Sequence, residues 1–136
     1  MQNTKNLRVA EHARRLGVAV YRLTAEFPVS ERFGLTSQMR RSAVSIGSNI
    51  AEGCGRRTNR ELLAYLYIAS GSASELEFQL QMAEDLDYRD ATERSLLLKQ
   101  AQVTRRMLSR LTAFLRSQPA WRNGPAPNRR ESGKTL

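Results

Sequence analysis

The sequence predicts an all-α protein whose four helices form an antiparallel, up-down-up-down bundle. In four separate segments, apolar residues recur at alternating steps of three and four, which is the spacing of a bundle seam. The segments are joined by short connections, and none shows the alternation typical of a strand. Because short connections make successive helices antiparallel neighbours, the four segments predict one bundle over residues 1–117.

The first predicted helix covers residues 7–26 and the second covers residues 37–52. Pro28 cannot continue the first helix, so the chain is expected to turn there. Thr36 is the predicted N-cap of the second helix, and Gly53 its predicted end. The seam of the first helix is Val9, Ala13, Leu16, Val20, Leu23 and Phe27, and that of the second is Met39, Ala43, Ile46 and Ile50.

The third predicted helix covers residues 59–86 and opens with a capping box formed by Thr58 and Glu61. Its seam is the longest in the chain: Leu62, Leu66, Ala69, Ala73, Leu76, Leu80 and Ala83. The central residues 69–74 are all small, at a cost in helix propensity that close packing must offset. We therefore expect this turn to be buried against a neighbouring helix.

The fourth predicted helix covers residues 91–117, with Asp90 as its N-cap. Its inward side chains are Leu97, Ala101, Thr104, Leu108, Leu111 and Leu115. The composition then changes to proline, glycine and basic residues, which predicts a flexible basic tail over residues 118–136. Trp121 is the one residue of this tail that we expect to dock on the bundle or on a partner.

The charge is large and unevenly distributed. The chain carries a net charge of +9, with residues 58–88 at −5 and residues 89–117 at +5. Such an excess favours a polyanionic partner, although it can also serve solubility alone. Arg8, Arg15 and Arg22 recur every seven residues on the outer side of the first helix.

The fourth helix supplies most of the predicted phosphate contacts. Its candidate residues are Arg94, Lys99, Arg105, Arg106, Arg110 and Arg116, joined by Arg41 and Arg57. For Arg40 and Arg56 we favour a structural role, such as an ion pair between Arg56 and Glu52. The face carries no cluster of aromatic residues for base stacking, so binding would be led by the phosphate backbone and depend on salt.

Other classes of site lack the residues they need. His12 is the only histidine, which is too few for a di-iron bundle, and Cys54 has no partner for a disulfide. We predict no catalytic, cofactor or metal site. Without a signal peptide or an apolar run long enough to span a membrane, the expected location is the cytoplasm and no membrane partner is predicted.

Several stretches carry a family resemblance. Phe27 and Pro28, residues 31–53, residues 67–72 and residues 75–77 resemble the signature of bacterial four-helix-bundle proteins encoded within intervening sequences of 23S rRNA genes. The resemblance implies a homopentameric ring. It also implies kinship with the accessory variability determinant of diversity-generating retroelements, which binds a reverse transcriptase and nucleic acid.

Within the hallmark stretch, we expect Asn49 and Glu52 to form a buried polar pair that sets helix register. Ala10 departs from the aromatic residue that the family often has in the first helix, and Gly47 from the proline common in the second. Neither departure undoes the predicted fold.

These observations leave three functions open. The first is a non-enzymatic, basic, oligomeric bundle that binds RNA or DNA mainly through phosphates. The second is an accessory subunit that docks a protein such as a reverse transcriptase. The third is a purely structural oligomer, in which the charge asymmetry serves assembly alone.

Overall fold

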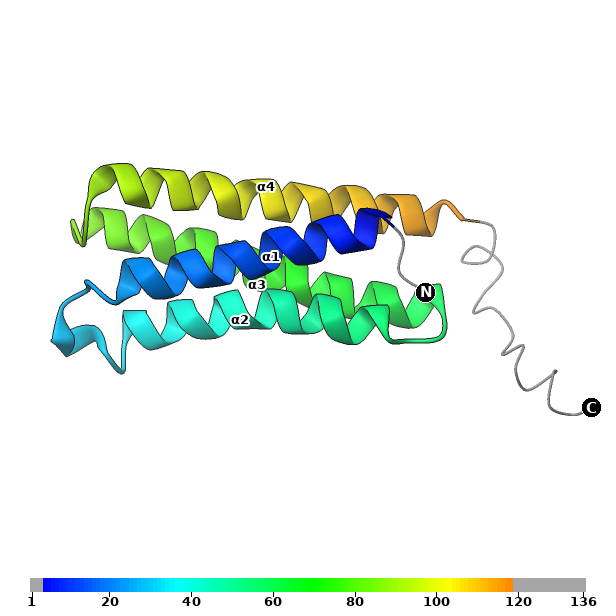
Figure 1. Ribbon diagram of the computed structural model, residues 1–136, viewed down its shortest axis with the longest axis horizontal. Helices are drawn as coiled ribbons and strands as arrows, with labels where there is room; N and C mark the ends of the chain where they lie inside the picture. The colour runs from blue at the N-terminus through cyan, green and yellow to red at the C-terminus, as the bar shows by residue number, and fades with distance from the viewer. Residues whose placement is uncertain (1–3, 119–136) are drawn as a thin grey trace, which may run out of the picture.

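The computed structural model describes residues 4–118, and over this range the protein is a bundle of four long helices (Figure 1). The helices are α1 (Thr4–Thr24), α2 (Leu35–Cys54), α3 (Asn59–Asp85) and α4 (Ala91–Arg116), with a short 3-10 turn, η1 (Val29–Glu31), between α1 and α2. Residues 4–118 contain no strand. The predicted all-α fold is confirmed, and the predicted tail with Trp121 lies outside the described residues except for Gln118.

The four helices lie side by side in chain order around one core. Each helix packs against the next one in the sequence, and α1 closes the bundle against α4, whereas the diagonal pairs do not touch. The α1–α2 and α3–α4 connections lie at one end of the bundle, and the α2–α3 connection lies at the other (Figure 1). This arrangement is the predicted up-down-up-down topology.

The core consists of the predicted seams. Every seam residue of the four predicted helices is buried, and Met39, Ile46 and Ile50 of α2 are among the largest fully buried side chains. Leu63, which the seam of the third helix does not include, is buried as well. Removing a large apolar side chain from water contributes roughly 1.5–3 kcal/mol, so these seams supply most of the favourable free energy of folding.

The ends of the helices differ from the prediction because groups outside each helix cap them. The helix α2 begins at Leu35, so Thr36 lies inside the helix instead of capping it. The missing cap is supplied from the preceding turn, where Oε1 of Glu31 accepts a hydrogen bond of 2.9 Å from the Leu35 amide. The helix α1 begins at Thr4 and ends at Thr24, which shifts both of its predicted limits toward the N-terminus.

Gly53 was predicted to end α2, but it lies buried inside the helix, which continues to Cys54. A Cβ atom at Gly53 would lie 2.9 Å from Cβ of Tyr65 and 3.3 Å from the Leu62 carbonyl oxygen. The glycine therefore permits α2 and α3 to approach each other closely near their connection. Its role is packing and not termination of the helix.

The predicted caps of α3 and α4 are present. Oγ1 of Thr58 accepts from the Glu61 amide at 3.1 Å, and Oδ1 of Asp90 accepts from the Thr92 amide at 2.7 Å. The glutamate half of the capping box differs, because Oε1 of Glu61 accepts from the Arg57 amide and not from Thr58.

The small-residue turn of α3 is only partly buried. Ser72 is buried and its hydroxyl lies 2.8 Å from that of Ser45 on α2. Gly71 and Ser74 are exposed, and no atom lies within 4 Å of a Cβ built at Gly71. The expectation that the whole turn is buried is therefore wrong.

The expected pair of Asn49 and Glu52 is also wrong. Nδ2 of Asn49 donates to the Ser45 carbonyl at 2.8 Å, whereas Glu52 is exposed and pairs with Arg56. The polar link between α2 and α3 is the contact of Ser45 with Ser72. Two hydroxyl groups satisfy each other there without a buried charge.

A hydrogen-bonded latch joins the two connections at one end of the bundle. The Tyr88 hydroxyl donates to Oε2 of Glu31 at 2.7 Å, and the Tyr88 ring lies 5.2 Å from that of Phe27. Hydrogen bonds from the Leu35 amide and from Tyr88 hold the pKa of the Glu31 carboxyl below its usual 4.5. The hydrogen bond to Glu31 also raises the pKa of the Tyr88 hydroxyl above its usual 10.0.

We predict that Glu31→Gln lowers the free energy of unfolding at pH 7 and that the difference from wild type shrinks in acid. A carboxylate whose pKa is lower in the folded state stabilises the protein above its unfolded pKa. This contribution disappears as the pH falls below 4.5 through the lowered pKa of Glu31. Urea unfolding at pH 7 and in acid measures the effect. The exposed Glu84→Gln is the control, and an equal loss in both variants would contradict the latch.

The glycines of α2 and α3 give a second prediction. Gly71→Ala should stabilise the protein by roughly 1 kcal/mol, because alanine is the better helix former and Gly71 has open space around it. Gly53→Ala should instead destabilise it by about 1–3 kcal/mol, because the added methyl group is overpacked against Tyr65 and Leu62. Urea unfolding at equal protein concentration compares the two. Stabilisation by both substitutions would show that α2 and α3 are not closely packed at Gly53.

Candidate nucleic-acid interface

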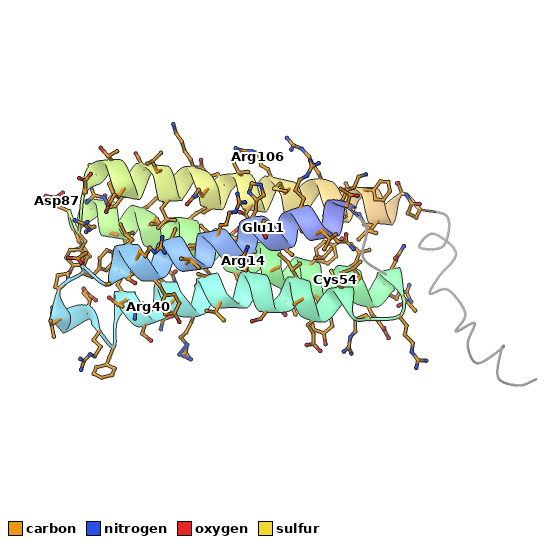
Figure 2. All side chains as sticks on the ribbon, in the orientation of Figure 1. Glu11, Arg14, Arg40, Cys54, Asp87 and Arg106 are labelled. Carbon is orange, nitrogen blue, oxygen red and sulfur yellow. The ribbon has the colours of Figure 1, made fainter. Side chains whose placement is uncertain are left out.

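The outer side of α4 carries the free cations of the predicted set. Lys99, Arg106 and Arg110 are exposed, and their side chains make no ion pair or hydrogen bond within residues 4–118. Arg106 lies on the side of α4 that faces away from the bundle (Figure 2). These three side chains can therefore reach an external anion without first giving up an internal partner.

Arg105 and Arg116 face α3 and are already engaged. Arg105 forms an ion pair with Glu77 of α3, and the Glu77 side chain is 15% exposed. The Arg116 guanidinium donates to the Tyr67 hydroxyl at 2.7 Å. Part of the acidic charge of α3 is thus neutralised inside the bundle, which makes both arginines weaker candidates for phosphate binding.

Arg94 does not belong to the interface, and its prediction as a phosphate contact is wrong. Only 7% of the residue is exposed. Its Nη1 donates to the carbonyl oxygens of Tyr88 at 2.6 Å and Arg89 at 3.0 Å, and lies 3.5 Å from Asp87. Because Asp87 and Arg89 both have left-handed backbones, with φ of 57° and 65°, Arg94 holds a constrained turn together.

The predicted residues Arg41 and Arg57 lie away from α4. Arg41 is an exposed residue of α2, which makes no contact with α4, and Arg57 lies in the α2–α3 connection. Arg40 has the structural role that we favoured, since its Nε donates to Oγ1 of Thr24 at 2.9 Å. Arg56 pairs with Glu52 at 3.0 Å, also as expected.

The structure adds arginines of α1 that the predicted set omitted. A groove of about 700 Å³ lies between α1 and α4, and its walls carry Arg14, Arg15, Arg22 and Arg89 beside Glu26 and Glu93. Arg8 precedes Arg15 by one heptad and is exposed. The heptad repeat of these arginines was visible in the sequence, but their position beside α4 depends on the closure of α1 against α4.

We call the resulting surface the basic face. It consists of Arg8, Arg15 and Arg22 from α1 with Lys99, Arg106 and Arg110 from α4. The carboxylate of Glu11 pairs with Arg14 and Arg15, which partly offsets the charge and lowers the pKa of Glu11. An excess of cations on two adjacent helices creates a positive potential that attracts phosphate.

The basic face offers no free aromatic ring for base stacking. Phe114 is the aromatic residue at the α1–α4 contact, and the Lys5 ammonium lies 3.5 Å from its ring centroid. Phosphate groups are therefore the part of a nucleic acid that this face can bind.

Other kinds of site find no support in the described part of the chain. Residues 4–118 contain no group of three or more histidine, cysteine, aspartate and glutamate side chains arranged to hold a metal ion. His12 and Cys54 are both half-buried. None of the described helices is long and apolar enough to cross a membrane.

Comparisons with known proteins agree with the fold. The family of 23S rRNA-intervening sequence proteins matches residues 5–110. A crystal structure of a protein of unknown function from the S23 ribosomal protein family of Bacteroides thetaiotaomicron superimposes with a TM-score of 0.73 at 20% identity, covering 81% of this chain and 99% of that one. A search of curated proteins finds no match. Since the family match spans most of the bundle, the chain belongs to the 23S rRNA-intervening sequence protein family.

Proposed function

We propose that the protein is a non-enzymatic nucleic-acid-binding bundle whose basic face contacts the phosphates of RNA or DNA. The observation that carries the proposal is the set of unpaired cations Lys99, Arg106 and Arg110 beside the arginine row of α1. The nearest acidic helix, α3, uses Glu77 to neutralise Arg105 on a different side of α4. Its charge therefore does not cancel the basic face.

Binding of this kind reads the backbone and not the bases. Each phosphate that a cation neutralises releases counterions, so the affinity falls steeply with salt. The family description associates its members with 23S rRNA, which makes structured RNA the first ligand to test.

A protein partner such as a reverse transcriptase is the second candidate. The α1–α4 groove contains apolar side chains besides its arginines, and Leu96 is 58% exposed there. An exposed leucine adds nothing to phosphate binding but suits a protein surface. This reading predicts tight binding to the protein partner and weak binding to nucleic acid alone.

The proposal predicts that the triple variant Lys99→Glu, Arg106→Glu and Arg110→Glu loses nucleic-acid binding while its bundle stays folded. If all three residues contact phosphate, the slope of log affinity against log salt should fall in magnitude by about three. Arg105 is left unchanged, because a glutamate there would face Glu77. Fluorescence anisotropy with a labelled structured RNA and a duplex DNA measures the affinity, and circular dichroism checks the fold.

The matched control is Arg32→Glu, Arg41→Glu and Arg57→Glu, which makes the same change in net charge on exposed residues away from α4. It should retain most of the binding. Equal losses in the two triple variants would mean that only net charge matters, and binding by the α4 variant as tight as wild type would refute the assignment of the basic face.

A further inference from the structure

The helix α3 is apolar on its outer side as well as on its inner side. Its outward residues include Ile68, Phe78, Met82 and Leu86, which recur at helical spacing and which we call the α3 ridge. Phe78 is 62% exposed. A helix with apolar residues on two opposite sides is typical of one that is covered on both. Nothing in the described chain covers the α3 ridge.

A second uncovered apolar surface lies between α1 and α2. This groove has a volume of about 850 Å³ and is lined mainly by small side chains. Ala10, Gly17 and Ala25 line it from α1, and Gly47 and Ala51 line it from α2. Small residues along a groove let another helix approach closely. We call this surface the α1–α2 groove.

The two surfaces match in length and shape. At 1.5 Å per residue, the groove extends about 22 Å from Ala10 to Ala25, and the ridge about 27 Å from Ile68 to Leu86. The ridge presents large side chains, whereas the groove is lined mostly by small ones. The shapes therefore fit a ridge of one helix entering a groove between two others.

The charges of the two surfaces are also complementary. Glu75 lies within the ridge and Asp85 at its edge, and neither forms an ion pair in residues 4–118. Arg14 and Arg22 stand on the wall of the α1–α2 groove. Ridge against ridge would oppose carboxylates, and groove against groove would oppose arginines. Ridge against groove is the arrangement that brings opposite charges together.

We propose that the α3 ridge of one copy of this chain docks in the α1–α2 groove of a second copy. The contact is heterologous, because each copy uses one surface to bind and offers the other. The proposal goes beyond nucleic-acid binding, and its test contains no nucleic acid, so either claim can fail without the other.

The placement of the two surfaces has a further consequence. The groove lies on the α1–α2 side of the bundle and the ridge borders the α2–α3 side, so the two sides adjoin at α2. Successive copies are then turned relative to one another, as closure into a ring requires. In such a ring α2 faces the axis and α4, which lies diagonally opposite, faces outward. The basic face stays accessible.

The first test is the mass of the full-length protein and of two variants by light scattering. Gly17→Gln fills the groove, and it leaves the bundle intact because no atom lies within 4 Å of a Cβ at that position. Phe78→Glu places a charge on the ridge. Wild type should exceed the 15.4 kDa of one chain, whereas each variant should be a monomer with unchanged helix content. The exposed Ser95→Gln on α4 should remain assembled.

Mixing the two variants tests the heterologous arrangement. Phe78→Glu keeps an intact groove and Gly17→Gln keeps an intact ridge, so a mixture can form one complete contact and no more. The expected product has twice the mass of one chain and does not grow with concentration. Failure of the variants to pair on mixing, a monomeric wild type, or an unchanged mass in either variant would overturn the proposal.

Discussion

The packing of α2 between α1 and α3 is the constraint on which the rest of the structure depends. The seam of α2 is narrow, with Met39, Ile46 and Ile50 completely buried between small residues. Gly53 then brings α2 and α3 together where a side chain would not fit. Because α2 is thin, α1 and α3 both reach the core and α4 can close the bundle against them. The same thinness leaves the shallow, small-residue groove between α1 and α2.

The fold could be predicted from the sequence because burial in a bundle follows a short repeat. Each seam residue is placed by neighbours three and four positions away, so the pattern is local even though the core is not. The helix limits were less accurate, since Glu31 caps α2 from the preceding turn and Gly53 answers to α3. A residue's own helix contains no record of such contacts.

The candidate interface was predictable only in part, for the same reason. The excess of cations on α4 is a property of the sequence, and Lys99, Arg106 and Arg110 lie exposed on that helix. Whether an arginine is free depends on its tertiary neighbours. Arg94 is committed to carbonyl groups of the preceding turn, and Arg105 is paired with a glutamate of another helix. The contribution of α1 follows from its contact with α4.

Charge separation links the two proposals. The acidic residues gather on α3, where Glu77 serves the bundle and Glu75 lies in the ridge, and the cations of α1 and α4 face another way. The most direct test is a salt titration of wild-type protein binding to a structured RNA. If all six cations of the basic face contact phosphate, the slope of log affinity against log salt should be about −5. No association at low salt by a folded protein would contradict the account.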